Sequence, residues 1–256
     1  LFAGFADGPL TSRIAGVVAS SVSGLGLLEA IPDARLDALA DPEDRDGNGI
    51  SGKRGDGRFG WRARFKTVLE QTAQAFALDM GLSNRYYPTA AGDCTAKQSA
   101  CQARSNKGIE VSDSVLESVA DYVVNLGPPA RNAADTPDVL EGRALFYETG
   151  CAQCHTPSHQ TGPHRFSWLT DKVIWPYTDL LLHDMGPGLG DAGGQEWRTP
   201  PLWGLGRHGD VNGNAYYLHD GRAKSLAEAI RWHGGEGALS RARFGALGTQ
   251  DRALLI

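Results

Sequence analysis

Apolar residues recur at helical spacing in two stretches of the first half of the chain. A helix over residues 67–80 is predicted by the positions Val68, Leu69, Ala73, Phe76 and Ala77. A second helix, over residues 111–126, is predicted by an apolar face made of Val115, Leu116, Val119, Tyr122 and Val123. Before them, residues 24–40 predict one short helix, for which Pro32-Asp33 is the start signal.

The second half predicts shorter helices separated by long loops. Thr136-Pro137-Asp138 caps a helix that leads to Cys151, and Ser225 is the expected N-cap of a helix over residues 225–232. Between residues 156 and 219 the chain is rich in glycine and proline, which favours turns. No alternating strand pattern persists over any segment. We therefore expect a mostly α fold with long Gly/Pro-rich loops.

The strongest chemical signal is the run Cys151-Ala152-Gln153-Cys154-His155. Two cysteines three positions apart can form thioethers with the two vinyl groups of a haem, and the next histidine then reaches the iron. Zinc would require a second pair of ligands, and a redox dithiol would follow a strand and begin a helix. Here a helix precedes the motif. We therefore predict covalent haem c, held by Cys151 and Cys154, with His155 as the proximal iron ligand.

Two residues are candidates for the second axial ligand of this haem. His233 ends the helix that begins at Ser225 and is followed by two glycines, and we predict it as the distal ligand. Met185 is the alternative. A methionine ligand would raise the reduction potential of the haem, whereas a second imidazole would lower it. We interpret His219 as a structural histidine, hydrogen-bonded near the haem edge.

Composition narrows the class of partner and the compartment. The formal net charge of −5 argues against a nucleic-acid partner, which requires a basic surface. No apolar run approaches the roughly 18 to 20 residues of a membrane-spanning helix. Cys94 and Cys101 lie in an expected loop, where their spacing favours a disulfide over two free thiols. A disulfide and haem c both indicate an oxidising compartment, so we predict the periplasm.

A weak internal repeat indicates two related units. Asp56-Gly57-Arg58 precedes the helix over residues 67–80, and Asp220-Gly221-Arg222 precedes the helix over residues 225–232. Each helix ends beside a potential iron ligand, Met80 in the first copy and His233 in the second. A linker at residues 127–132 separates the copies. We expect a partial N-terminal domain at residues 1–128 and a C-terminal domain with the haem motif at residues 129–256.

Several runs resemble the di-haem oxidoreductase family, whose members are also described as thiol oxidoreductases. The longest is WPYTDLLLHDMGP at residues 175–187. The others lie at residues 196–204, 217–222 and 232–236, and upstream at residues 26–32 and 57–61. The resemblance covers nearly the whole chain. The family is similar to the di-haem cytochrome c peroxidases and the methylamine-utilisation di-haem enzymes.

This resemblance implies two cytochrome c-like domains, each with one haem c. The family's N-terminal CxxCH motif is absent here. We expect a chain truncated at both ends, with the second haem on the missing upstream part, and a protein that truly has one haem is the alternative. In the peroxidases the C-terminal haem transfers electrons and the N-terminal haem binds peroxide. Their distal Met or Tyr aligns with His233, which predicts bis-histidine ligation of the C-terminal haem.

The resemblance also points to residues of the N-terminal haem pocket. Asp79-Met80 stands where the relatives have a catalytic Glu followed by Met, so Asp79 would shuttle a proton during O–O cleavage. Met80 would lie in the same pocket. The relatives relay electrons through a tryptophan between the haems, for which Trp61 is the candidate. The alternatives are local hydrogen bonding by Asp79 and a packing role for Trp61.

A polar loop before this pocket has the spacing of a calcium site. Asp44, Asp46, Asn48 and Ile50 place oxygen ligands at alternate positions, with glycine at the sharp turn, as in the first half of an EF-hand loop. Gly55 stands where the bidentate Glu would be. The peroxidase relatives carry calcium between their domains, which supports the prediction. An Asx-rich turn without an ion is the alternative.

Three functions fit these observations. The first is a periplasmic di-haem oxidoreductase, peroxidase-like, that receives electrons from small redox proteins or quinone-linked donors and passes them from the C-terminal haem to a second haem. The second is a pure electron-transfer cytochrome c, and the third is an enzyme that oxidises residues of a partner protein. Thiol chemistry has no support, because Cys94 and Cys101 show no activating neighbours.

Overall fold

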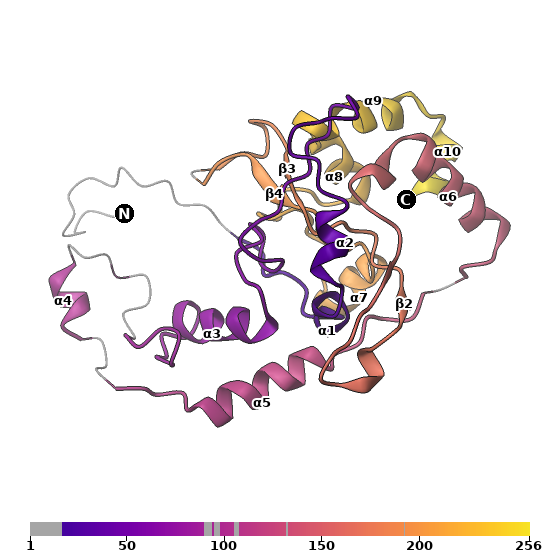
Figure 1. Ribbon diagram of the computed structural model, residues 1–256. Coiled ribbons are helices and arrows are strands. Elements are labelled where there is room, and N and C mark those ends of the chain that lie inside the picture. The colour runs from indigo at the N-terminus through magenta and orange to yellow at the C-terminus, as the bar shows by residue number, and fades with distance from the viewer. Residues whose placement is uncertain (1–16, 90–93, 95–97, 105–107, 132, 192) are drawn as a thin grey trace.

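The computed structural model describes residues 17–89, 94, 98–104, 108–131, 133–191 and 193–256, and its described part is mostly α (Figure 1). The α-helices are α1 (Leu25–Glu29), α2 (Asp33–Asp37), α3 (Val68–Leu78), α4 (Ser99–Gln102), α5 (Asp113–Val124), α6 (Pro137–Glu148), α7 (His208–Asn212), α8 (Leu226–Trp232), α9 (Ala238–Ala246) and α10 (Thr249–Leu255). The 3-10 helices are η1 (Cys151–Gln153), η2 (Ser167–Leu169), η3 (Leu205–Arg207) and η4 (Gly235–Gly237). In Figure 1, α3 and α5 lie at one side of the molecule and α6, α9 and α10 at the other.

The long predicted helices are confirmed within two residues at each end, except that α6 stops at Glu148. The single short helix expected over residues 24–40 is wrong, because α1 and α2 are separate. Pro32 lies between them in an extended conformation, at φ −60° and ψ 139°. Proline has no amide hydrogen to donate, and it disfavours the helical conformation of the residue before it. The chain therefore stops α1 and begins α2 after the proline.

The two copies of the internal repeat begin their helices with the same hydrogen bonds. Thr67 Oγ1 accepts from Glu70 N at 3.1 Å, and Ser225 Oγ accepts from Glu228 N at 3.1 Å. Each glutamate reaches back to the residue before the cap, to Lys66 N at 2.7 Å and to Lys224 N at 2.9 Å. These reciprocal contacts satisfy amide groups that have no partner inside a helix.

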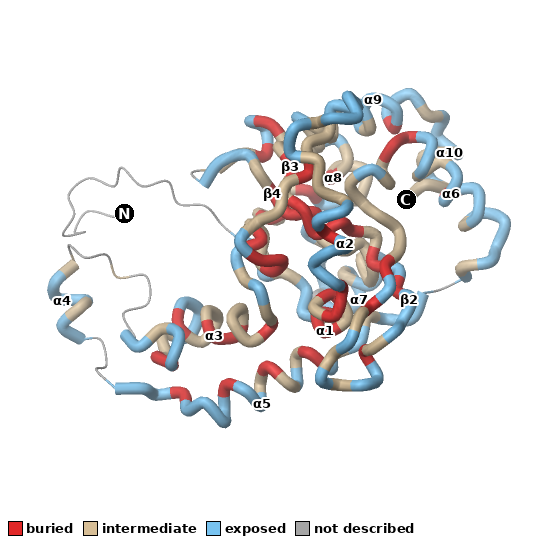
Figure 2. Tube along the Cα trace, viewed as in Figure 1, coloured by how far each residue is buried: buried red, intermediate tan, exposed pale blue. Residues whose placement is uncertain are grey.

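The largest core cluster joins both sides of the predicted domain boundary. It contains Leu25, Leu28, Ile31, Leu36, Phe59, Val68 and Val124 from the first half and Leu169, Ile174 and Leu180 from the second. A smaller cluster around Ala73, Val111 and Leu116 packs α3 against α5. Figure 2 shows buried positions gathered around α1 and strand β4 (Glu196–Arg198), while much of α5 and α9 is exposed. The division at residue 128 stays a prediction, because the two halves share a core.

Two helix crossings depend on glycine. A Cβ placed on Gly142 of α6 would lie 2.0 Å from Leu254 O of α10. One on Gly26 of α1 would lie 2.2 Å from Val124 O, at the end of α5. Both distances are far below van der Waals contact, so any larger side chain would force the helices apart. Each half of the chain therefore has one close helix crossing, α1 with α5 in the first half and α6 with α10 in the second.

Short antiparallel strands complete the second half. Strand β1 (His159–Gln160) pairs with β2 (Val173–Ile174), and β3 (Leu182–Asp184) pairs with β4 (Glu196–Arg198), with His183 opposite Trp197. The sequence did not predict them, because two or three residues are too few to show an alternating pattern. The predicted disulfide between Cys94 and Cys101 is present. Among the described helices, none combines the length and the apolar character needed to cross a bilayer.

Candidate haem site

The predicted attachment motif follows α6 through a glycine turn. Gly150 adopts the left-handed conformation, with φ 85°, and the chain then enters η1 at Cys151. Only glycine enters this conformation without steric cost, so the turn is fixed at this position. Cys151 and Cys154 are half-buried and are not joined to each other. Burial raises the pKa of the Cys151 thiol, which therefore stays protonated at neutral pH.

His155 is oriented by a backbone carbonyl. Its Nδ1 lies 3.0 Å from Tyr177 O, and Nε2 makes no hydrogen bond within the described part of the chain. Burial, and next the nearby charge of His233, lowers the pKa of His155 to about 4, so the ring is neutral at pH 7. A neutral imidazole whose Nδ1–H is held by a carbonyl presents the Nε2 lone pair, which is the arrangement of a metal-ligating histidine.

The segment that holds His155 is the start of the longest family-like run. Tyr177 and Leu180 are non-glycine residues with positive φ, 54° and 60°. This conformation costs free energy and persists only where neighbours enforce it. Here Thr178 N donates to Thr156 O at 3.0 Å and Asp179 N donates to Cys154 O at 3.1 Å. The irregular segment therefore runs alongside the attachment motif and directs the Tyr177 carbonyl at His155.

His233 is oriented in the same way from another element. It is the C-cap of α8, and its Nδ1 lies 2.8 Å from Ala229 O, one turn earlier. Its Nε2 likewise makes no hydrogen bond to any described residue. Burial lowers the pKa of His233, so this imidazole is also neutral at pH 7. The charge that His233 carries when protonated lowers the pKa of His155 further.

Met185, the alternative ligand, lies beside His233. A Cβ placed on Gly237 would be 3.3 Å from Met185 Cε and 3.3 Å from His233 Cδ2. The fold therefore brings both predicted distal ligands to one place, although 48 positions separate them in the sequence. Which of the two residues binds the iron stays a prediction. The anchored Nδ1 of His233 favours His233, because a fixed ring loses less rotational freedom on binding iron.

The residues present fit a haem c. Two unpaired cysteine thiols, one neutral imidazole beside them and a second neutral imidazole within electrostatic reach supply the attachment and axial groups that such a haem requires. Each imidazole keeps its Nε2 for a ligand because a carbonyl occupies Nδ1. Cys151, Cys154, His155 and His233 would hold the group.

Three residues beside this set were not predicted. His183, Asp179 and Glu236 form a buried chain of hydrogen bonds next to Cys154. Asp179 and His183 directly flank the apolar run Leu180-Leu181-Leu182. Titratable residues at both ends of a buried run are the sequence signal that could have found them. Glu236 had no such signal, because only folding brings it to His183.

Trp61 lies in an aromatic cluster that joins the two halves. His219 stacks on Trp197 at a centroid distance of 3.6 Å, and Trp61 meets the edge of His219 at 6.4 Å. Trp61 Nε1 donates to Val18 O at 2.7 Å, and the guanidinium of Arg62 covers Trp197 at 3.6 Å. His219 Nε2 also lies 3.8 Å from Asp220 Oδ2, and the predicted hydrogen bond of His219 near the haem edge stays a prediction. A relay role for Trp61 stays a prediction.

Asp79 and Met80 lie at the end of α3 and are exposed. Asp79 is the C-cap of α3, and 62% of Met80 is accessible. No cluster of metal-ligating side chains surrounds them in the described part of the chain. Their predicted place in a haem pocket therefore depends on residues beyond the described set, and it stays a prediction. They differ from His233 because no described element covers them.

The predicted calcium loop folds as a series of Asx turns. Asp44 accepts from Gly49 N at 3.1 Å, Asp46 from Asn48 N at 3.1 Å, and Asn48 from Ile50 N at 2.8 Å. Carboxylate oxygens of Asp41, Asp44 and Asp46 lie within 4.8 Å of one another. Asp41 was not predicted, because it precedes the EF-hand spacing. Backbone amides donate hydrogen bonds to these side chains. The cluster is compatible with a calcium site and with an Asx-rich turn that holds no ion, so calcium stays a prediction.

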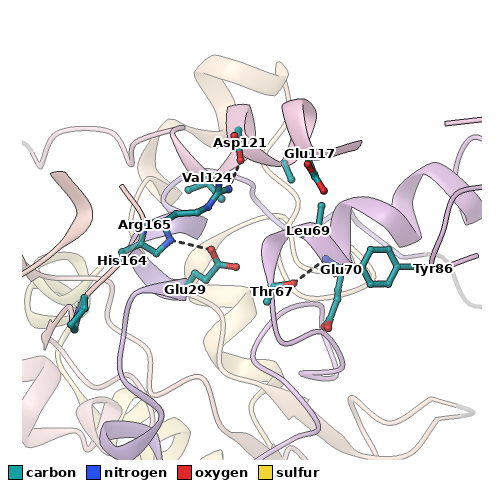
Figure 3. Close-up of a pocket in the computed structure, with 12 residues that line it drawn as sticks. Glu29, Thr67, Leu69, Glu70, Tyr86, Glu117, Asp121, Val124, His164 and Arg165 are labelled. Atoms are coloured by element: carbon teal, nitrogen blue, oxygen red, sulfur yellow. Dashed lines mark hydrogen bonds and ion pairs between the residues drawn. The ribbon is translucent and has the colours of Figure 1, made fainter. Parts of the chain in front are cut away.

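A cavity of about 560 Å³ lies away from the haem motif, between α1, α3, α5 and the loop at residues 163–165 (Figure 3). Four of the charged or titratable groups that line it form two pairs. His164 contacts Glu29 at 3.3 Å, and Arg165 pairs with Asp121. None of the predicted site residues lines it. The cavity is therefore a largely apolar cleft between elements and not the predicted haem site.

Fold and site together define a mostly α protein with the side chains of a haem c centre. Comparison with family models agrees with this class. Residues 11–256 match the family described as "Di-haem oxidoreductase, putative peroxidase", and the chain belongs to this family. The family implies haem cofactors and confirms the resemblance in the sequence.

Comparison with curated proteins finds no match. A solved structure of hydrazine synthase from Kuenenia stuttgartiensis is similar to the chain at 14% identity and a TM-score of 0.36. The similarity covers 96% of this chain and 95% of that one. At this score it carries no argument about fold or function.

Proposed function

We propose that this chain is part of a periplasmic c-type di-haem oxidoreductase with peroxidase-like activity. Cys151 and Cys154 would hold a haem covalently, His155 and His233 would bind its iron, and the haem would supply electron transfer. A second haem domain receives these electrons and performs the substrate chemistry. Small redox proteins or quinone-linked donors supply them. Membership of the di-haem oxidoreductase family supports the class of reaction.

One observation carries the proposal. Two half-buried, neutral imidazoles, His155 and His233, each have Nδ1 on a backbone carbonyl, at 3.0 and 2.8 Å, and each keeps Nε2 without a described partner. Both Nε2 atoms therefore stay available to a ligand, and the carbonyl at Nδ1 fixes the direction of each lone pair. The unpaired cysteines beside them supply the covalent attachment.

The protein's own part in electron transfer is to hold both ligands still. The haem, when bound, supplies a one-electron Fe(III)/Fe(II) couple. The Tyr177 carbonyl and the Ala229 carbonyl fix the two imidazole rings, so the coordination need not change between the oxidation states. Little reorganisation favours electron transfer over substrate binding at this centre. Peroxide chemistry then belongs to the second haem, for which Asp79 is the proposed proton carrier.

The proposed compartment is supported by two features of the chain. The disulfide between Cys94 and Cys101 forms in oxidising surroundings, and haem c attachment needs reduced thiols such as Cys151 and Cys154 at the moment of loading. Both conditions are met in a bacterial periplasm. Calcium at the Asp41–Asp46 cluster is an additional proposal, and a melting temperature that rises with calcium and falls with chelator would support it.

The test is spectroscopy of the complete protein, produced with haem-maturation machinery. We expect haem that stays with the polypeptide after denaturation and a low-spin EPR signal from a bis-histidine centre. His233→Ala should abolish that signal, and added imidazole should restore it. Met185→Leu is the matched control and should leave the signal unchanged. If Met185→Leu changes it and His233→Ala does not, Met185 is the ligand.

Two further outcomes decide the rest of the proposal. Haem that is released from the wild-type protein by denaturation would refute covalent attachment at Cys151 and Cys154. Reaction with hydrogen peroxide should occur at a high-spin haem other than the low-spin centre. If every haem of the complete protein is six-coordinate and inert to peroxide, the protein is an electron-transfer cytochrome without substrate chemistry.

A further inference from the structure

His183 is a buried histidine that the proposed electron transfer does not use. Only 2% of it is accessible. Its Nε2 lies 2.8 Å from Asp179 Oδ2 and its Nδ1 lies 2.7 Å from Glu236 Oε2. Each ring nitrogen therefore faces a carboxylate oxygen. Because carboxylates only accept hydrogen bonds, both nitrogens carry a proton and the ring is an imidazolium.

The same imidazolium touches the haem-attachment motif. Cys154 Sγ lies 3.6 Å from His183 Nδ1. Asp179 is bound to the same residue through the backbone, since Asp179 N donates to Cys154 O at 3.1 Å. Two members of the network therefore contact Cys154, one at its sulfur and one at its carbonyl.

Glu236 connects the network to the segment that contains His233. It lies in η4, three residues after His233. Its Oε1 accepts from Ser51 Oγ at 2.7 Å and from Asp184 N at 3.3 Å. Gly235 allows this close approach, because a Cβ there would lie 2.2 Å from Asp184 O. The network thus joins the attachment motif, the distal-ligand segment and the N-terminal half.

The charges of this network act at short range. Burial opposes the imidazolium, but hydrogen bonds to Asp179, Cys154 and Glu236 outweigh it and raise the pKa of His183 to about 12. Two carboxylates and one imidazolium leave one negative charge among these three groups. A negative charge in a buried setting is weakly screened, and it stabilises the ferric iron relative to the ferrous iron.

We propose that Asp179, His183 and Glu236 form a positioning network that fixes the His233 segment against the Cys151–His155 motif and lowers the reduction potential of the haem held there. The proposal rests on the proposed haem at His155. None of the three residues binds iron. They act through the side chains they orient and through their charge.

The experiment compares Glu236→Gln with the wild type as the haem-loaded complete protein at pH 6. Glutamine has the same shape and can still accept a hydrogen bond, so the fold is retained while one buried negative charge is removed. We expect covalent haem and the low-spin signal to remain, and the reduction potential to move to a more positive value. Ser51→Ala, which removes one hydrogen bond to Glu236 and no charge, should broaden the low-spin EPR signal and shift the potential less.

Glu148→Gln is the matched control. Glu148 ends α6 next to the motif but is exposed, so its charge is screened by water and its removal should leave the potential unchanged. Equal potentials for wild type and Glu236→Gln, or equal shifts for Glu236→Gln and Glu148→Gln, would overturn the network while the bound low-spin haem upholds the proposed function. Absence of covalent haem in the wild type would instead refute the proposed function itself.

Discussion

The two halves of the chain share local structure but differ in what they can bind. Both have a helix that begins with a hydroxyl cap and a back-bonding glutamate, at Thr67 and at Ser225. Both have a helix crossing that only glycine permits, at Gly26 and at Gly142. Yet all seven histidines and both unpaired cysteines lie after residue 150. The repeated scaffold is therefore separate from the haem chemistry that one copy supports.

The difference lies in how potential ligands are held. His233, at the end of α8, is half-buried and its ring is fixed by the Ala229 carbonyl. Met80, at the corresponding end of α3, is 62% accessible. A ligand becomes useful when burial and a second contact fix its donor atom, because binding then loses little conformational entropy. Position in a repeat suggests a ligand, and its surroundings decide whether it is ready to bind.

The largest expected effect distinguishes a predicted iron ligand of the second half, His155, from Met80 in the first half. His155→Ala should abolish the low-spin signal of the haem attached at Cys151 and Cys154, because the proximal imidazole is lost. Met80→Ala should leave the signal of that haem unchanged, since Met80 belongs to the other half. EPR of both variants measures this. Equal loss of signal in both would break the comparison between the halves.

A smaller but still large effect is expected at the glycine crossings. Gly142→Ala should destabilise the protein by about 3 kcal/mol, because its Cβ would lie 2.0 Å from Leu254 O. Gly26→Ala should behave alike, with 2.2 Å to Val124 O. Urea denaturation measures both. Gly245→Ala in α9 is the control, since nothing lies within 4 Å of its Cβ, and it should gain about 0.5 kcal/mol.

Acid should destabilise the second half first in the haem-free protein. Burial lowers the pKa of His155 to about 4 and also lowers that of His233, from an ordinary 6.5. Below pH 6.5 the unfolded chain therefore binds more protons than the folded one, and stability is lost as the pH falls towards about 4. Hydrogen exchange at pH 7 and pH 5 should show earlier loss of protection in α6 and α8 than in α3 and α5. Equal loss of protection in all four helices would contradict a role of His155 and His233 in acid unfolding.

The smallest effects should be equal in the two halves. Thr67→Ala and Ser225→Ala each remove a cap hydrogen bond of 3.1 Å and should each cost about 1 kcal/mol. Thermal unfolding measures them, with Ser118→Ala as a control in the middle of α5. Unequal costs would show that tertiary packing, and not the cap, sets the stability of the two helix starts.

Much of the local structure could be predicted from the sequence. The cap of α8, the end of α6 before the motif and the disulfide between Cys94 and Cys101 depend on nearby residues. One helix was predicted across Pro32, whereas the structure has two, and the chemistry of proline explains the break. The strands β1 to β4 were missed, because their pairing depends on residues 12 or more positions apart and not on a local pattern.

The sequence by itself determined the class of cofactor, and it predicts the attachment residues, because Cys151, Cys154 and His155 lie within five positions and thioether chemistry needs only their spacing. Tertiary structure alone decided how these residues are oriented. The Tyr177 carbonyl at His155, the meeting of Met185 with His233 and the placement of Glu236 on His183 all join segments more than 20 residues apart. Such contacts arise from packing and glycine-permitted close approach, which no local pattern encodes.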